Sequence, residues 1–229
     1  MYAVWKHEAE MTSDFRAKLL GEVSKRLIEM GVHKLRISVV DDDVAAADSL
    51  RMETSKPPIS GMISLWVDTA VNRKPLEDVI AGAAARMAGY LVTESEPIVN
   101  TRYVVPDAQR TPGMNQVVFL KKSVRLSYEN WLEIWLGSHT QVAMDTQSTF
   151  GYRQNIIVRP LTYAAPPYDA IIEENFPEAA MSDPAAFYDA VGDEEKRKKR
   201  ETAMFQSCIR FIDFDKIDRI PTSEYVMKS

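Results

Sequence analysis

The sequence has few of the residues that build redox and metal sites. Its 229 residues include one cysteine, Cys208, and three histidines. A single cysteine excludes an intrachain disulfide and also a multi-cysteine zinc or iron–sulfur site. No apolar run approaches the roughly 20 residues that span a bilayer. The N-terminal MYAVWKHEAE carries charges where a signal peptide needs an apolar stretch. We therefore expect a reduced, cytoplasmic protein with no membrane partner.

An excess of basic charge is also missing. The chain has 28 Lys and Arg against 33 Asp and Glu, a formal net charge of −5. Residues 1–108 hold 13 basic and 16 acidic side chains, and residues 109–229 hold 15 and 17. Nucleic-acid-binding domains need a basic surface, so we expect no nucleic-acid partner. Glycine-rich phosphate loops, HExxH pairs and GxSxG elbows are absent too, so nucleotide, zinc-protease and serine-hydrolase functions have no support.

The residues that are present are typical of a globular protein. Hydrophobic residues make up 45% of the chain and charged residues 27%, which is enough apolar material for a core. Phe15, Leu19, Val23 and Leu27 recur every four residues, which predicts an amphipathic helix. The pattern of the first half predicts strands at 3–7, 34–40, 62–67 and 91–105, helices at 12–30 and 75–90, and a surface connection at 44–58.

The second half repeats this order of elements. Its pattern predicts strands at 116–121, 151–158, 168–176 and 208–214, and helices at 127–144 and 182–200. Two successive βαββαβ units predict an α+β protein of two tandem ferredoxin-like repeats, residues 1–108 and 109–229. Pressing the open faces of the two sheets together would form a barrel-type pseudo-dimer around a central cavity. This arrangement leaves further pairing into a homodimer open.

Aromatic and polar residues form a further pattern in the second half. It consists of VVFLKK at 117–122, then Trp131, Trp135 and His139, then GYRQN at 151–155, and DAIIEENF at 169–176, which contains Glu173. On these residues, the run 117–173 resembles the EthD family of the dimeric α+β barrel superfamily. The resemblance covers about half of the chain, and the first half matches only in the order of its elements.

The resemblance implies a barrel with a ligand site and leaves the reaction open. Related barrels include cofactor-free aromatic monooxygenases, muconolactone isomerases, polyketide cyclases and haem enzymes. The sequence departs from the family pattern at two places. Thr140 and Gln141 follow His139 where the family usually has a small residue and proline, and Ala170 stands where glycine is usual.

Three residues of the predicted helix at 127–144 are candidates for a pocket wall. Trp131, Trp135 and His139 are spaced four apart, so they share one helix face. Two indoles beside an imidazole would form an apolar wall with one group that titrates near neutral pH. We therefore predict substrate-binding roles for both tryptophans and an acid–base role for His139, the alternative being that all three are core. Val23 occupies the equivalent place in the first half, which predicts a single site.

The following strands supply candidate polar groups. Asp169 and Glu173 share one face of their strand by the two-residue period. A buried carboxylate has a raised pKa unless it is paired, so we predict Glu173 as catalytic and Asp169 as substrate-binding. Pairing with Arg153, Arg159 or Arg210 would make them structural instead. Tyr152 could donate to a developing oxyanion and Asn155 could bind substrate, although an ideal strand places these two on opposite faces.

Together these features predict a cofactor-independent enzyme that binds no metal. It would use acid–base chemistry of the lyase, isomerase or cyclase type on an aromatic or polyketide-like small molecule. An aromatic monooxygenase of the same barrel type and a non-catalytic binder of apolar small molecules are the alternatives. Haem binding, with His139 as the axial ligand, is a further one.

Overall fold

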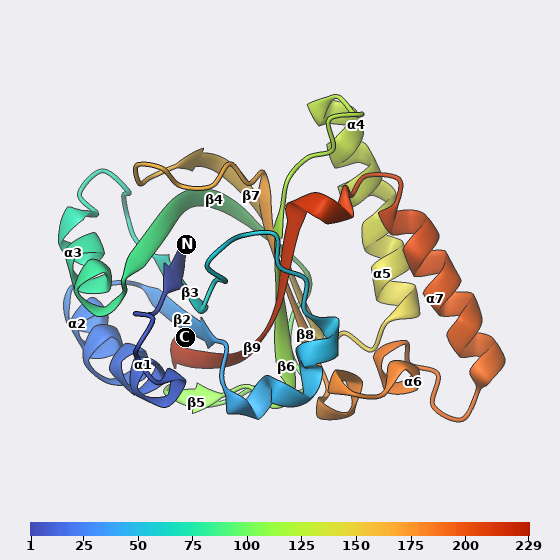
Figure 1. Ribbon diagram of the computed structural model, residues 1–229, viewed down its shortest axis with the longest axis horizontal. Helices are drawn as coiled ribbons and strands as arrows, with labels where there is room; N and C mark the ends of the chain where they lie inside the picture. Colours follow the sequence, from blue (N-terminus) through green and yellow to red (C-terminus); the bar gives the residue numbers. More distant parts are fainter.

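The computed structural model describes all 229 residues and contains one closed antiparallel barrel. Its eight strands are β1 Tyr2–Trp5, β2 Lys34–Val39, β3 Gly61–Trp66, β4 Arg86–Ile98, β6 Met114–Leu120, β7 Gly151–Pro160, β8 Ala170–Phe176 and β9 Ile217–Lys228. They are hydrogen-bonded in the order β2-β3-β1-β4-β7-β8-β6-β9, and β9 also pairs with β2, which closes the barrel (Figure 1). A two-residue strand, β5 Gln109–Arg110, pairs with Tyr225 and Val226 of β9, beyond the part of β9 that pairs with β6.

This closed barrel shows that the expectation of two tandem ferredoxin-like repeats is wrong. That expectation placed two separate sheets face to face. In the structure the halves share one sheet, because β4 pairs with β7 and β2 pairs with β9. Closure gives every barrel strand two neighbours and so removes the unpaired edges that two open sheets would keep. The division at residues 108 and 109 stays a prediction, and β5 follows it directly.

Two local predictions in the chain are also wrong. The stretch 86–90, assigned to a helix, begins β4, because α3 ends at Ala83. The stretch 208–214, assigned to the last strand, is the end of α7 and the turn after it; the last strand is β9. The alternating apolar residues of 208–214 imitate a half-buried strand. The sequence pattern misses β9 because this strand contains Pro221, and proline lacks the N–H that a strand ladder uses.

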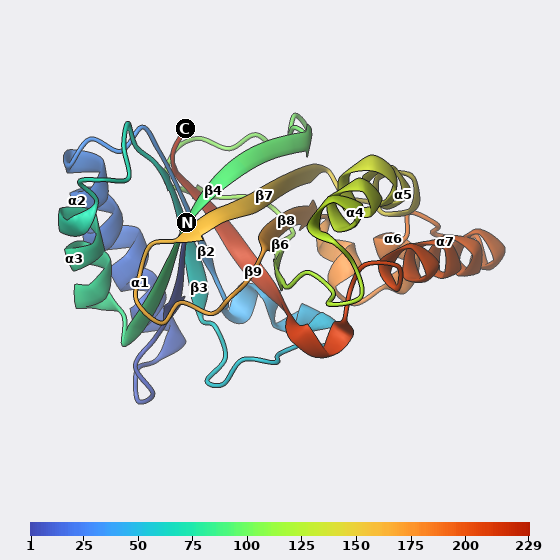
Figure 2. The same cartoon turned by 90° about the horizontal axis from the view of Figure 1, so that it is seen from above.

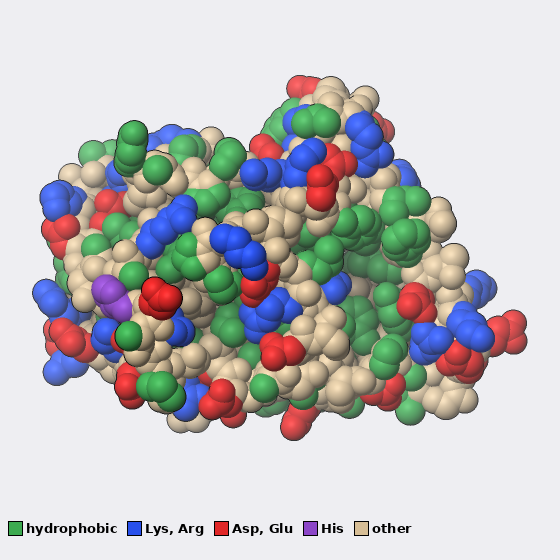
Figure 3. All heavy atoms as spheres, in the orientation of Figure 1, with side chains coloured by type: hydrophobic (Ala, Val, Ile, Leu, Met, Phe, Trp, Pro, Cys, Tyr) green, Lys and Arg blue, Asp and Glu red, His purple; other side chains and the backbone are tan.

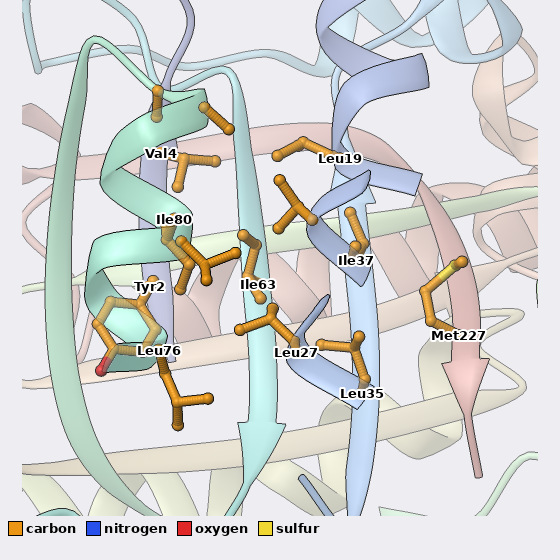
Figure 4. Packing of buried hydrophobic residues seen from close by; sticks show 14 of the residues in the cluster. Tyr2, Val4, Leu19, Leu27, Leu35, Ile37, Ile63, Leu76, Ile80 and Met227 are labelled. Atoms are coloured by element: carbon orange, nitrogen blue, oxygen red, sulfur yellow. The ribbon is translucent and has the colours of Figure 1, made fainter. Parts of the chain in front are cut away.

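The helices form two groups on opposite sides of the barrel (Figures 1 and 2). One group is α1 Thr12–Lys18, α2 Ser24–Glu29 and α3 Lys74–Ala83; the other is α4 Tyr128–Leu132, α5 Thr140–Thr146, α6 Pro184–Phe187 and α7 Glu194–Cys208. A π-helical turn joins α1 to α2 and another, Glu133–His139, joins α4 to α5. In the first group Leu19, Leu27 and Ile80 pack directly onto Ile37 and Ile63 of the sheet, and all five are fully buried (Figure 4).

Side chains fill most of the barrel interior. Trp5, Phe119 and Ile171 belong to one buried apolar cluster there. Beside this cluster, Arg153 lies between the carboxylates of Glu173 and Glu224. The central cavity expected from the sequence is therefore occupied by a core and by a buried ion-pair network. The larger ligand-sized spaces lie at one end of the barrel and outside its wall.

Candidate functional site

The candidate site is a cavity of about 180 Å³ between the outer face of the barrel and the second group of helices. Its floor is formed by β6, β7, β8 and β9, and its roof by the π-helical turn Glu133–His139, α7 and the turn after α7. Figure 3 shows hydrophobic side chains gathered around a hollow in this region, between the barrel and the helix pair α5–α7. Fourteen of the 19 lining residues are hydrophobic, so polar groups there lie in apolar surroundings.

A row of three side chains crosses the floor. Tyr152 on β7 is the register partner of Glu174 on β8, and Glu174 is the register partner of Gln116 on β6. All three line the cavity. Directly opposed residues of antiparallel strands have their Cβ atoms about 5 Å apart. The Gln116 Nε2 donates a hydrogen bond of 3.0 Å to Glu174 Oε2. The row therefore holds a phenol, a carboxyl group and an amide next to one another.

A second row lies two residues further along the strands. It consists of Ile172 on β8, Val118 on β6 and Arg219 on β9, which are successive register partners. The two apolar side chains form a flat centre beside Glu174, and Arg219 supplies a cation at the far side. The floor therefore has a carboxyl group at one place, an arginine at another and an apolar surface between them.

The helix above the floor is placed by its own sequence. The Ser127 hydroxyl accepts a hydrogen bond from a backbone N–H of the first turn, as the sequence permits, and so begins the helix. The four-residue spacing of Trp131, Trp135 and His139 turns all three toward the sheet, and all are buried. Trp135 and His139 line the cavity, whereas Trp131 packs behind Trp135 with ring centroids 5.1 Å apart. The helix therefore brings one indole and the imidazole to the site.

His139 is held in position from α7. Its Nδ1 lies 2.9 Å from Ser207 Oγ, and its ring packs against Phe211 with centroids 4.7 Å apart. Burial, together with the nearby charge of Arg210, lowers the pKa of His139 to about 4. The imidazole is therefore neutral at pH 7, which leaves it able to accept a proton or a hydrogen bond.

Glu174 is perturbed in the opposite direction. Burial raises the pKa of its carboxyl group to about 7, against the weaker effects of the Gln116 hydrogen bond and the charge of Arg219. A carboxyl group with this pKa exchanges its proton readily at neutral pH. Two titratable groups whose surroundings move their pKa values apart are characteristic of acid–base sites. Glu174 and His139 form such a pair in one cavity.

Tyr152 keeps its proton. Burial and the neighbouring Glu174 raise the pKa of its hydroxyl group above the ordinary value. The Tyr152 oxygen accepts a hydrogen bond of 3.0 Å from Gln154 Nε2, which also donates to Thr140 Oγ1. No hydrogen bond in the structure uses the Tyr152 proton. The hydroxyl is therefore oriented by its neighbours while its own donor stays free for a ligand.

Three further polar atoms of the lining have no partner. They are Gln116 Oε1, Trp135 Nε1 and Gln147 Oε1, and each belongs to a buried side chain. A buried polar atom without a hydrogen bond costs roughly 1–3 kcal/mol, which a polar ligand can recover. The cavity thus offers both donors and acceptors to a bound molecule.

The structure places only some of the predicted site residues together. His139, Tyr152 and Trp135 line the cavity. Glu173 points into the barrel, where Arg153 Nη2 donates to its Oε1 at 3.0 Å and Asn155 donates to its Oε2 at 3.1 Å. These contacts match the ion-pair alternative for Glu173 and place Glu173 and Asn155 outside this cavity, so the catalytic and substrate-binding roles predicted for them stay predictions.

The other two predicted residues are also outside the cavity lining. Trp131 supports Trp135 from behind. Asp169 accepts a hydrogen bond of 2.7 Å from the backbone N–H of Lys122 and so fastens a loop to the end of β8. The residue that sequence reasoning missed is Glu174. Its signal was present, because it is the one charged residue on the otherwise apolar face of Ala170, Ile172 and Phe176.

A second hollow lies at one end of the barrel. It has a volume of about 340 Å³ and is lined in part by Trp66, Glu94 and Asn155. The charged side chains of its lining have partners outside it: Glu94 lies 3.9 Å from the Arg36 guanidinium, Arg73 lies 2.8 Å from Glu77, and Asp68 lies 2.6 Å from His33. The smaller cavity, with its free donors and acceptors, is the stronger candidate.

Comparisons with known proteins assign no family. No protein-family model and no curated protein matches the sequence, so the resemblance to the EthD family stays a prediction. A solved structure described as an anthrone oxidase-like protein superposes with a TM-score of 0.46 at 8% sequence identity, over 100% of this chain and 92% of that one. No helix of the structure has the length and hydrophobicity needed to cross a membrane. Function must therefore be inferred from the chemistry of the cavity.

Proposed function

We propose that the protein is a small-molecule enzyme that transfers a proton within the cavity beneath the π-helical turn Glu133–His139 and α7. The observation that carries this proposal is the pairing of Glu174, with a pKa of about 7, and the neutral His139 in one apolar pocket. Proton transfer by positioned side chains works best when the pKa of the acid or base lies near the working pH. Glu174 meets this condition, and the reaction needs no cofactor.

Each polar group has a distinct part in the proposed reaction. The Glu174 carboxylate removes a proton from a carbon next to a carbonyl group or from a ring hydroxyl, and returns it at a second position. The Tyr152 hydroxyl donates a hydrogen bond to the oxygen on which negative charge develops. The neutral His139, fixed through Ser207, supplies the second hydrogen-bonding group. The outcome is an isomerisation, an elimination or a ring closure without net oxidation.

The cavity sets the size of the substrate. An apolar cavity of about 150 Å³ accepts a benzene-sized molecule, so a cavity of about 180 Å³ suits one substituted ring. Trp135 and Phe211 supply aromatic walls for such a ring. A fused polycyclic compound or a porphyrin would need more space than this. We therefore propose a monocyclic aromatic or enone substrate in place of a large polyketide.

The proposal is tested by deuterium exchange. Purified protein is incubated in D₂O with cyclohexenones and hydroxylated monocyclic aromatics, and solvent deuterium in the compounds is followed by NMR. We expect incorporation with the wild type and a loss of at least about 100-fold in Glu174→Gln. Equal exchange in the two proteins, or no exchange above the rate in buffer with any compound, would refute proton transfer.

An oxygen electrode separates this chemistry from the monooxygenase alternative. Proton transfer consumes no dioxygen, whereas a monooxygenase consumes one molecule of dioxygen per turnover. Oxygen uptake with a hydroquinone that depends on Glu174 or His139 would replace the proposal with that alternative. Tight binding of compounds without exchange or oxygen uptake would identify a binding protein.

A further inference from the structure

Arg219 is the cation of the cavity floor, and it lacks an anionic partner. Its Nε donates to the backbone oxygen of Leu50, its side chain makes no other hydrogen bond, and it forms no salt bridge. The contrast with Arg153 is direct, because that arginine is held between two carboxylates inside the barrel. The terminal nitrogens of Arg219 are therefore available to a ligand.

The surroundings of Arg219 favour a negatively charged ligand. The side chain is partly buried, and it lines the cavity next to Phe187 and Tyr188. Its closest carboxyl group on the floor, Glu174, influences it through its charge and does not form a salt bridge with it. Against the apolar lining of the cavity, the attraction between this guanidinium and an anion is less screened than in bulk water. Its planar fork of donors matches a carboxylate group in two parallel hydrogen bonds.

The anionic group would lie on the cavity side of Arg219. The same side chain also borders a neighbouring pocket of about 240 Å³, which contains the Glu201 carboxylate. That carboxylate would repel an anion entering from the neighbouring pocket. The cavity side presents Val118 and Ile172 beside the guanidinium, where an aromatic ring attached to the anion can pack.

The spacing on the floor fits one ring between the two charged groups. Arg219 on β9 and Glu174 on β8 are separated by β6, so two strand spacings of about 4.8 Å lie between them. A carboxylate bound at Arg219 therefore places the ring over Val118 and Ile172. The opposite edge of the ring then faces Glu174 and Tyr152, where the proposed proton transfer takes place.

We infer that the substrate is a monocyclic aromatic or unsaturated carboxylic acid, with Arg219 as the residue that binds its carboxylate and so determines specificity. The reaction of this substrate rests on the proposed function. The carboxylate of the substrate is inferred from Arg219 alone. It explains why a cavity with a largely apolar lining contains an unpaired arginine. It also fixes the orientation of the substrate, whose carboxylate lies at β9 and whose reacting end lies at β7 and β8.

The test compares two probes of the same shape and different charge. 4-Hydroxybenzoate and 4-hydroxybenzamide are titrated into the protein at pH 6, where the acid is ionised and Glu174 holds its proton. Binding is measured by calorimetry. We expect the wild type to bind the acid at least about tenfold more tightly than the amide, which corresponds to roughly 1.4 kcal/mol. Arg219→Gln should bind the two equally, and Arg219→Lys should keep part of the preference.

Matched controls keep the outcome clear. Arg159→Gln removes an exposed arginine of β7 that is outside the cavity lining, and it should leave the preference unchanged. Melting temperatures show whether the variants fold. If Arg219→Gln does not fold, the comparison uses Arg219→Lys, which conserves the charge. Equal binding of both probes by the wild type, or binding of neither at millimolar concentration, would overturn the inference. An acid preference that depends on Arg219 would stand even if no compound exchanged deuterium, which would refute only the proposed reaction.

Discussion

Tyr152 and Glu174 face each other across adjacent strands, as register partners on β7 and β8 with both side chains in the cavity. After burial, the Glu174 carboxylate is the next largest cause of the raised pKa of the Tyr152 hydroxyl. At pH 7 the phenol therefore keeps its proton while the carboxyl group exchanges its own. One cross-strand pair thus combines a hydrogen-bond donor with an acid–base group.

The ionisation of Glu174 should control the pH dependence of activity. The rate of deuterium incorporation should rise with pH as the carboxylate forms, with a midpoint near its pKa of about 7. His139, with a pKa of about 4, stays neutral through this range and adds no second inflection. The measurement is the exchange rate between pH 5 and pH 9. A profile with the same midpoint in Glu174→Gln would assign the ionisation to another group.

Glu174 should also lower the stability of the fold as pH rises. Its folded-state pKa is raised, so the folded state holds the proton more tightly than the unfolded chain does. The resulting stabilisation is complete below about pH 4.5 and is lost as pH rises through about 7. The loss should be about 3 kcal/mol. Urea titrations of wild type and Glu174→Gln across this range measure it, and a constant difference between the two proteins would contradict the prediction.

His139 should act on stability in the opposite pH range. Its folded-state pKa is lowered by burial, so the unfolded chain binds the proton more tightly. The contribution is present above about pH 6.5 and is lost as pH falls toward 4. We expect His139→Gln to abolish this acid-dependent loss of stability and to lower exchange activity at pH 8. Full activity of a folded His139→Gln would remove the imidazole from the mechanism.

The neighbouring residue Glu173 should behave as a structural group. Glu173→Gln leaves the Arg153 guanidinium short of one carboxylate inside the barrel, and breaking a buried pair costs roughly 3–5 kcal/mol. The ratio of acid to amide affinity should not change, because Glu173 is outside the lining of the cavity. Chemical denaturation and the calorimetric titration test the two parts separately. A stable variant with an altered ligand preference would reverse the assignment.

Cys208 offers a chemical test of burial in the cavity. Its thiol lines the cavity, and burial raises its pKa to about 12. Because the thiolate is the reactive form, iodoacetamide at pH 8 should modify the native protein far more slowly than the urea-unfolded chain. Mass spectrometry follows the modification. Equal rates in the two states would show that the thiol is open to solvent.

Local features of the chain were determined by the sequence itself. The four-residue spacing predicted a helix that presents Trp135 and His139 on one face, and the structure has them there. The two-residue period of β8 places Glu173 and Glu174 on opposite faces, as the structure has them. Helix spacing and strand alternation depend on backbone geometry alone, so they can be read without knowledge of the fold.

Only the tertiary structure determines which face of each strand lines the cavity. In a closed barrel covered by helices both faces of β8 are buried, so burial cannot tell the interior from the helix side. Arg153 reaches both Glu173 and Glu224 only because β7, β8 and β9 curve around one interior. Glu174 faces the cavity only because the π-helical turn Glu133–His139 and α7 cover the outer wall there. Strand pairing between residues far apart in the chain fixes both environments, and no local pattern encodes that pairing.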